Sequence, residues 1–239
     1  PGYFADGHGL IDLYVNGQPV KDLLLPPGSI VPNFAFNKFN IESVTIGGFK
    51  TDAPTTINAS SFYNCTNLKK LNVYGNLTYI GNDAFRSTGL ETVELPSTLL
   101  NIGTGSFAYC KQLRHITFPE SLTTLPNGTV FGCEQLESLI IPEGVTYCGF
   151  QIASGTMNNG LKTISLPSPL EAVSRVTRPS FEDFTHNLEF LSWALVAPAA
   201  NFDNFTGFTV HVPQGAGQNY KNKAAWTNAE IIDDLLVGN

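Results

Sequence analysis

The sequence predicts an α/β repeat solenoid that is predominantly β, a coil with one parallel sheet along one face. Three observations lead to this fold class. Four similar segments begin 23, 23 and 25 residues apart, each has apolar residues at its first, fourth and sixth positions, and each has Pro at its seventh. The segments are residues 90–96, 113–119, 136–142 and 161–167.

Each segment is expected to be a β-strand with one buried side. Side chains alternate between the two faces of a strand, so the fourth and sixth residues point inward and the third and fifth outward. The Pro lacks an N–H group and therefore ends the strand. One row cannot bury its own apolar side, but stacked rows can. The predicted core column is Leu71, Val93, Ile116, Leu139 and Ile164.

The second half of each repeat has its own pattern. An apolar pair three residues apart follows the Pro, as in Leu99 and Ile102, and a small residue with an aromatic one comes next. This register predicts a second core column of Phe85, Phe107 and Phe131. Looser copies of the repeat begin at Val20, Ile41, Leu68, Leu188 and Phe208, so nine predicted rows cover residues 20–213.

The period and spacing are typical of leucine-rich repeats, which form right-handed coils. The unit L-x-x-I-x-L-P-x-x-L-x-x-I-G-x-x-A-F-x-x-C resembles the BspA-like, or Treponema-type, repeats on surface proteins of Bacteroides and relatives. The tail, with Val210-His-Val-Pro213 and Trp226, resembles the closing segment of those proteins. The resemblance implies a surface protein that contacts host proteins or other cells.

We expect a single domain over residues 1–239, with caps at 1–19 and 214–239 around the repeats, because end rows would otherwise expose core side chains. The N-terminal cap is predicted to be a hairpin, in which residues 10–15 turn at Asn16-Gly17 and pair with residues 20–25. At the other end, residues 218–226 are predicted to form a short helix. The side chains expected over the last row are Tyr220, Trp226, Ile231 and Ile232.

Composition narrows the range of partners. The 239 residues carry a formal net charge of −7 and only 13 Lys and Arg, so no basic surface for nucleic acid or anionic lipid is expected. The sequence has no membrane span and no signal peptide, and it begins at Pro1. We therefore expect a mature or trimmed fragment of a protein that is secreted or anchored at the outer cell surface.

The four cysteines fall on repeat columns. Cys65, Cys110 and Cys133 each lie three residues before the next opening Leu, with Ser87 as the expected neighbour in the row between, and Cys148 takes the place of Ile102. Buried free thiols that act as small apolar fillers are favoured. A disulfide between Cys110 and Cys133 is the alternative, because adjacent rows bring Cα atoms close. Zinc is disfavoured, since no Cys-x₂-Cys pair occurs.

Catalytic and cofactor signatures are missing from the sequence. None of the four histidines belongs to a known catalytic motif. Residues 103–108 fit G-x-G-x-x-A, but Gly103 aligns with Gly81 and Gly149 as a repeat glycine. We expect a protein that is not an enzyme and uses no cofactor. An enzymatic alternative would need a cleft in the irregular stretch 150–187.

The predicted function is binding through the outward sheet face. Ile140 and Phe190 are apolar at outward positions, where anchors of an interface are often found, and His115 could add pH sensitivity near its unperturbed pKa of about 6.5. The expected partner is a protein or cell-surface ligand, in the host matrix or on bacteria. A glycan-binding accessory protein is the alternative; it requires exposed aromatics, and Phe190 is the only one at an outward strand position in the readable rows. The candidate face is Lys70, Asn72, Thr92, Glu94, His115, Thr117, Ser138, Ile140, Thr163, Ser165 and Phe190, followed by Ser192.

Overall fold

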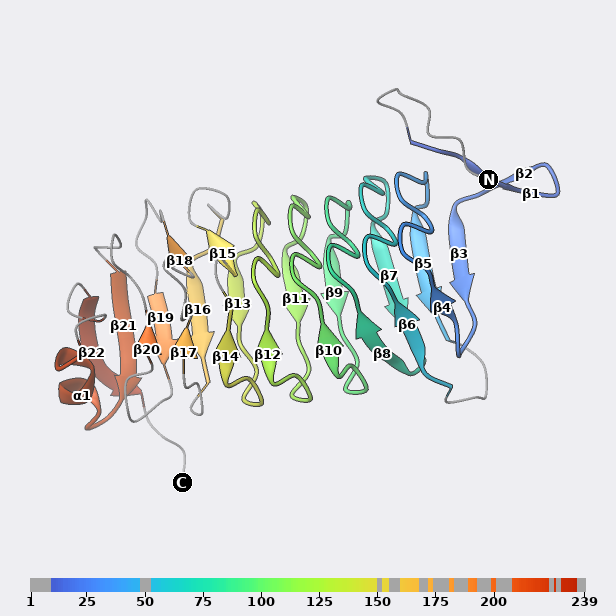
Figure 1. Cartoon of the computed structure of the whole chain (residues 1–239). Helices are drawn as coiled ribbons and strands as arrows, with labels where there is room; N and C mark the ends of the chain where they lie inside the picture. The colour runs from blue at the N-terminus through green and yellow to red at the C-terminus, as the bar shows by residue number, and fades with distance from the viewer. Residues whose placement is uncertain are drawn as a thin grey trace.

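The chain forms an elongated coil of stacked rows, with its N-terminal strands at one end and its C-terminal strands at the other (Figure 1). This computed structural model describes residues 10–47, 53–149, 152–154, 160–167, 172–173, 181–182, 189–192, 199–200, 208–223, 226 and 229–235. The described residues are nearly all in strands and turns, and their only α-helix has five residues. The predicted β-rich solenoid is therefore confirmed.

The main ladder is parallel and contains the first strand of each row. One five-stranded sheet contains β3 (Asp22–Leu25), β5 (Ser43–Ile46), β7 (Lys70–Val73), β9 (Thr92–Glu94) and β11 (His115–Thr117). A second contains β13 (Ser138–Ile140), β16 (Thr163–Leu166), β19 (Glu189–Ser192), β21 (Phe208–Pro213) and β22 (Ala229–Leu235). The rows stack in the predicted register, because Val93 pairs with Ile116 and Leu139 with Ile164.

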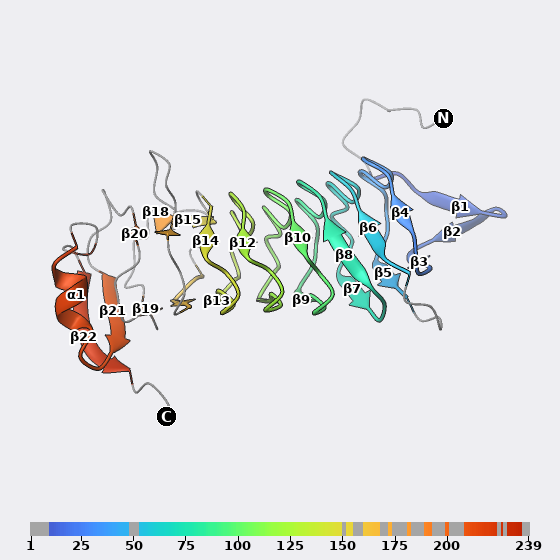
Figure 2. The same ribbon diagram turned by 60° about the horizontal axis from the view of Figure 1, so that its bottom comes forward.

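A second parallel ladder lies on another side of the coil (Figure 2). Its strands are β4 (Ile30–Val31), β6 (Thr55–Ile57), β8 (Leu77–Ile80) and β10 (Asn101–Ile102), then β12 (Thr124–Leu125), β14 (Tyr147–Cys148), β17 (Ala172–Val173) and β20 (Ala199–Ala200). The short strands β15 (Ala153–Ser154) and β18 (Phe181–Glu182) also pair in parallel. The prediction of one sheet face was thus incomplete, because the apolar pair after the Pro also builds a sheet.

The predicted aliphatic core column is confirmed. All five of its side chains are at most 8% exposed. Full burial of such a side chain stabilises the fold by about 1.5–3 kcal/mol. The column members are Leu71, Val93, Ile116, Leu139 and Ile164.

The aromatic column differs from the prediction in one row. Phe36, Phe62, Phe85 and Phe107 form a continuous stack, with ring centroids 5.2 to 5.4 Å apart. In the next row Val130 takes this position. The Phe107 N–H donates to the carbonyl of Thr129, the residue before Val130, just as the Phe85 N–H donates to the carbonyl of Ser106, the residue before Phe107. Predicting Phe131 in this column was wrong. Val130 is fully buried, and Phe131 is displaced to a half-buried place outside the stack.

Close approach between rows explains the glycine column that includes Gly103. A Cβ atom at Gly103 would lie 2.3 Å from the backbone nitrogen of Asn82 in the preceding row. Gly149 is equally close to the backbone of Asn127. Residues 103–108 form a turn after β10 and no helix, so they lack the strand–loop–helix context of a dinucleotide site. These glycines serve row stacking, as predicted.

The cysteines are free and buried, as predicted. The Cys110 thiol donates a hydrogen bond to the Phe85 carbonyl, and the Cys133 thiol donates to the Phe107 carbonyl. In the row between Cys65 and Cys110, the column is filled by Thr88 rather than by the predicted Ser87, and the Thr88 hydroxyl lies 3.2 Å from the Cys110 sulfur. Each of these thiols thus ties its row to the preceding one.

Burial keeps these thiols protonated. It raises the pKa of Cys110 to about 11, and the pKa of Cys65 and of Cys148 to about 12, from an ordinary value of 9.0. A thiolate forms less readily in the folded chain than in the unfolded chain. The stability that the protonated thiols contribute to the folded state is therefore complete below pH 9 and is lost as the pH rises toward 11 or 12.

The N-terminal hairpin forms, but its partner strand differs from the prediction. β1 (Leu13–Val15) pairs antiparallel with β2 (Gln18–Val20) across Asn16-Gly17, whose φ angles of 51° and 76° suit a tight hairpin turn. Residues 22–25, which were expected to belong to the hairpin, form β3 of the main ladder instead. Ile11 makes a parallel bridge to Phe39, which attaches the hairpin to the first turn.

The C-terminal end contains a shorter helix and one more strand than predicted. The helix α1 spans Gly217–Lys221, and it places Tyr220 in the core beside Trp226, with both side chains fully buried. Ile231 and Ile232 were predicted to lie over the last row. They belong instead to β22, which extends the main ladder in parallel beyond β21.

The second residue of each of the seven rows that begin between residues 20 and 161 forms a column of alternating charge beside the main ladder. Backbone hydrogen bonds join neighbouring rows at this position, as from Arg114 N–H to the Glu91 carbonyl and from Lys162 N–H to the Glu137 carbonyl. The Lys162 Nζ also lies 3.4 Å from a Glu137 carboxylate oxygen. Opposite charges on adjacent strands stabilise pairing, whereas like charges oppose it. The column runs Lys21, Glu42, Lys69, Glu91, Arg114, Glu137 and Lys162.

Glu91→Lys is expected to destabilise the fold, because it creates a cationic run from Lys69 to Arg114. The expected loss is up to about 1 kcal/mol in the free energy of unfolding, and it should shrink in high salt. Glu94→Lys is the matched control, since its neighbour in the ladder is the uncharged Thr117. Urea denaturation at low and high salt measures both variants. Equal losses for the two would show that the alternation contributes nothing.

Candidate functional site

The outward face of the main ladder carries the predicted side chains from residue 70 to residue 165. Neighbouring strands pair in register, so that the backbone of His115 pairs with that of Thr92 and the backbone of Thr117 pairs with that of Glu94. Lys70, Thr92, Glu94, His115, Thr117 and Ile140 are exposed, and Asn72, Ser138, Thr163 and Ser165 are half-buried. The structure thus brings these ten residues onto one face.

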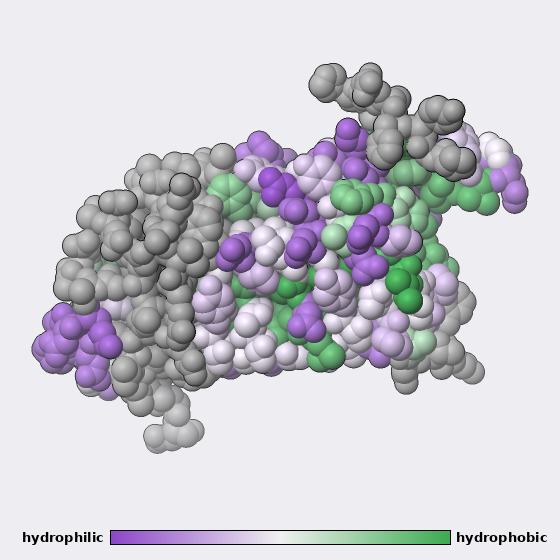
Figure 3. Space-filling view, viewed as in Figure 1, coloured by the Kyte–Doolittle hydropathy of each residue, from purple (hydrophilic) through white to green (hydrophobic). Residues whose placement is uncertain are grey.

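Most of this face is small and polar, and Ile140 is the exception. Its side chain is 64% exposed, whereas its neighbour Leu139 is fully buried and contributes to the core. The molecular side seen in Figure 3 is likewise a mixture of hydrophilic and neutral residues with separate hydrophobic patches. Asn72 and Thr45 are joined by a 3.3 Å hydrogen bond between their side chains.

Two exposed apolar residues near this face were missed from the sequence. Leu24 pairs with Thr45 in the fifth-position column and is 53% exposed. Tyr74 takes the place that Pro holds in later rows and is 74% exposed. Both lie in looser copies of the repeat, and the same count from the opening residue would have found them.

The last part of the predicted face was wrong by one residue. The backbone of Phe190 pairs with Ile164 and Val210, both fully buried, so this position is in register with a core column and not with the outward one, and the Phe190 side chain lies outside the described part of the chain. Ser192 is likewise buried, opposite Leu166. The rows predicted to start at Leu188 and Phe208 therefore start one residue earlier. The stretch before them lacks the Leu-to-Pro spacing that sets the register elsewhere.

Ser192 has a structural partner. Its hydroxyl lies 2.6 Å from the Tyr220 hydroxyl, which joins the main ladder to α1. Both residues are fully buried, and burial raises the pKa of Tyr220 to about 12. This contact fixes the C-terminal cap and removes Ser192 from the candidate face.

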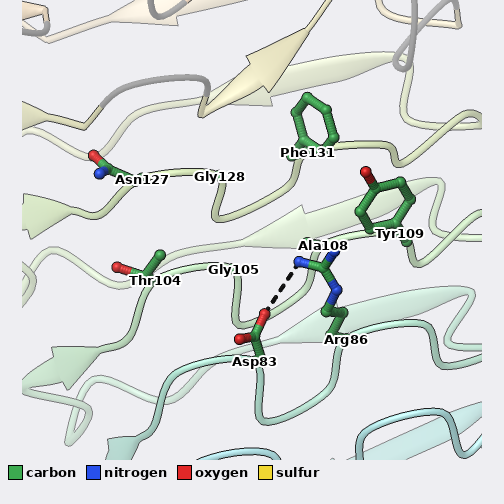
Figure 4. Close-up of a pocket in the computed structure, with 9 residues that line it drawn as sticks. All are labelled: Asp83, Arg86, Thr104, Gly105, Ala108, Tyr109, Asn127, Gly128 and Phe131. Atoms are coloured by element: carbon green, nitrogen blue, oxygen red, sulfur yellow. Dashed lines mark hydrogen bonds and ion pairs between the residues drawn. The ribbon is translucent and has the colours of Figure 1, made fainter. Parts of the chain in front are cut away.

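A hollow of about 370 Å³ lies on the turn side of the coil, over three successive rows. Figure 4 shows Thr104 and Asn127 on one side of it, Tyr109 and Phe131 on the other, and an Asp83–Arg86 ion pair at one end. Its floor includes Gly105, Ala108 and Gly128. Sequence reasoning did not find this hollow, because it considered outward residues only on strands.

The repeats that form these rows match a known sequence family. A family model described as "BspA type Leucine rich repeat region" matches residues 29–158 in six copies, more than half of the chain. The chain belongs to the BspA-type leucine-rich repeat family. A comparison with curated protein sequences found no match.

Three solved structures are similar to this BspA-type protein at low sequence identity. The pneumococcal vaccine antigen PcpA has a TM-score of 0.50 and 15% identity, over 93% of this chain and 91% of that one. A leucine-rich repeat protein from Bacteroides ovatus has a TM-score of 0.42 and 16% identity, over 95% and 79%. A leucine-rich cell surface protein from Faecalibacterium prausnitzii has a TM-score of 0.41 and 19% identity, over 70% and 60%.

Among the described residues, no group of three or more His, Cys, Asp or Glu side chains is placed to hold a metal ion. The helical part of the described chain contains no segment long and apolar enough to cross a membrane.

Ser192→Ala is expected to lower the free energy of unfolding by about 1–3 kcal/mol, because it removes a hydrogen-bond partner from the buried Tyr220 hydroxyl. Ser138→Ala, at an outward position in the same ladder, is the matched control and should change stability little. Thermal unfolding followed by circular dichroism compares the two. An outward-facing Ser192 would instead make both substitutions equally mild.

Proposed function

We propose that this BspA-type protein is a non-catalytic binding module at the cell surface, and that it holds a protein partner against the outward face of the main ladder. The surface location in this proposal rests on the family, since the repeat resembles those of Bacteroides surface proteins. The formal charge of −7 supports a protein partner over nucleic acid or anionic lipid.

The observation that carries the proposal is the exposure of Ile140 within an otherwise polar face. The fold does not need this side chain in the core, because Leu139 and Ile141 on either side are the buried residues of the strand. Exposed apolar side chains surrounded by polar ones are typical anchors of protein interfaces. In neighbouring rows the same column carries Thr117 and Ser165, which could form the polar rim.

The extent of the face supports a macromolecular partner. Successive parallel strands lie about 4.8 Å apart, so the rows from β7 to β16 present a long surface. Standard protein interfaces bury about 800 Å² on each partner, which needs a surface that spans several rows. Six of the ten side chains of this face are Asn, Ser or Thr, and such short side chains lose little conformational entropy when a partner covers them.

The experiment measures binding of the purified chain to immobilised extracellular-matrix proteins and to intact bacterial cells. Saturable binding is expected for at least one of these surfaces. The double substitution Thr117→Arg with Ile140→Arg should weaken that binding at least tenfold, because two long cationic side chains would prevent close contact across the face. Thr124→Arg, on the second ladder, is the matched control and should bind like the parent.

Circular dichroism establishes that each variant is folded. If the folded double variant binds as tightly as the parent, the outward face is only a solvated sheet and the proposal fails. Failure of every surface in the panel to bind the parent chain would also contradict it.

A further inference from the structure

We propose that the hollow on the turn side is a binding site for a neutral saccharide, separate from the outward face of the main ladder. A site for a small ligand needs a preformed concavity, a few polar groups that converge on it, and an apolar surface. The hollow has all three. Its volume of about 370 Å³ is within the usual range for small-molecule sites of about 300–1,000 Å³.

The hollow is lined by two turn positions that lack a side chain where the preceding rows have one. Each turn has a residue with φ near 60° at this point, and in the first three rows it is Phe34, Ser60 and Asp83. In the next two rows it is Gly105 and Gly128, with φ of 63° and 60°. Side chains are therefore compatible with this backbone conformation, so the backbone alone does not demand glycine. At Gly105 a Cβ atom would lie 2.6 Å from an Asp83 carboxylate oxygen, so glycine at this turn lets the Asp83 side chain lie at the edge of the hollow.

The aromatic wall is held rigidly in place. The Tyr109 and Phe131 rings meet edge to face, with centroids 5.2 Å apart. The Arg86 guanidinium lies 4.5 Å from the centroid of the Tyr109 ring. Tyr109 also packs against Gly132, where a Cβ atom would come within 2.8 Å of the ring. Phe131 belongs to this wall because Val130 replaces it in the core stack.

The polar groups favour a neutral ligand with several hydroxyls. Arg86 is neutralised by Asp83, at 3.2 Å, so an anion would meet the carboxylate and a cation the guanidinium. A pair of vicinal hydroxyls can donate to the Asp83 carboxylate and accept from Arg86 at the same time. The exposed Thr104 and Asn127 side chains add further polar groups on the opposite wall (Figure 4).

The apolar wall completes the match to a sugar. The C–H face of a pyranose ring packs on aromatic side chains, which present a large apolar surface with little entropy to lose. Phe131 is half-buried and supplies the apolar surface for this contact, whereas the Arg86 guanidinium already lies over the Tyr109 ring, which holds the wall in place. Carboxylate, guanidinium, amide, hydroxyl and aromatic groups thus converge on one hollow, and together they recognise a hexose unit of a glycan.

The test begins with an array of neutral glycans that end in glucose, galactose, mannose or N-acetylglucosamine, together with sialylated and sulfated glycans. Binding to at least one neutral glycan is expected, followed by titration with the corresponding methyl glycoside or disaccharide by NMR. Gly128→Asn should weaken this binding at least tenfold, since Asn tolerates the left-handed conformation and its side chain would occupy the hollow. Tyr109→Ala should have a similar effect.

Two matched controls separate the site from general effects on the turns. Ser60→Asn introduces the same side chain at the equivalent turn position outside the hollow, and Tyr74→Ala removes an exposed tyrosine elsewhere. Both variants should bind like the parent. Binding only to acidic glycans, or to none, would overturn the proposal. So would unchanged glycan binding by the folded Gly128→Asn variant. Neither result would affect protein binding at the outward face, which the double substitution Thr117→Arg with Ile140→Arg tests independently.

Discussion

A single row of this coil cannot bury its own apolar side chains, so every row depends on the rows beside it. That dependence explains why the same position in successive rows carries the same kind of residue. Val93 lies beside Ile116, the phenylalanine rings stack from Phe36 to Phe107, and Gly103 allows its backbone to approach Asn82. Even the charged residues follow it, since the column from Lys21 to Lys162 alternates in sign where like charges would repel.

The same constraint determines which residues are free for function. Inward positions must remain apolar, and turn positions with positive φ accept only residues that tolerate that conformation. The outward strand positions and the turn side chains are left to vary. The two proposed surfaces come from this freedom: Ile140 is an exposed apolar group that the core does not use, and turn residues of three successive rows line the hollow. Because they lie on different sides of the row, a glycan and a protein partner need not compete.

The sequence was sufficient for the solenoid, the aliphatic column and the buried thiols, because these depend on a spacing that repeats over many rows. It was insufficient where a row departs from that spacing. Phe131 was assigned to the aromatic stack because the Val-Phe pair imitates Ala84-Phe85, whereas the backbone register aligns Val130 with Phe107. Ser192 and Phe190 were misplaced for the same reason, a shift of one residue that exchanges the faces of a strand. The hollow escaped prediction because turn residues of three successive rows line it, and such a feature is visible only when the rows are stacked.

The central claim, that whole rows are the units of this fold, is tested most directly by removing one. Deletion of residues 113–135 removes one repeat of 23 residues and joins Gln112 to Leu136, so every remaining column keeps its register. Deletion of residues 113–124 is the control; it removes fewer residues but joins Gln112 to Leu125, which misaligns every column beyond that point. Circular dichroism during urea denaturation should show a β-rich, cooperative transition for the first variant and none for the second. If both variants unfold alike, or if only the shorter deletion is tolerated, row-by-row stacking does not determine this fold.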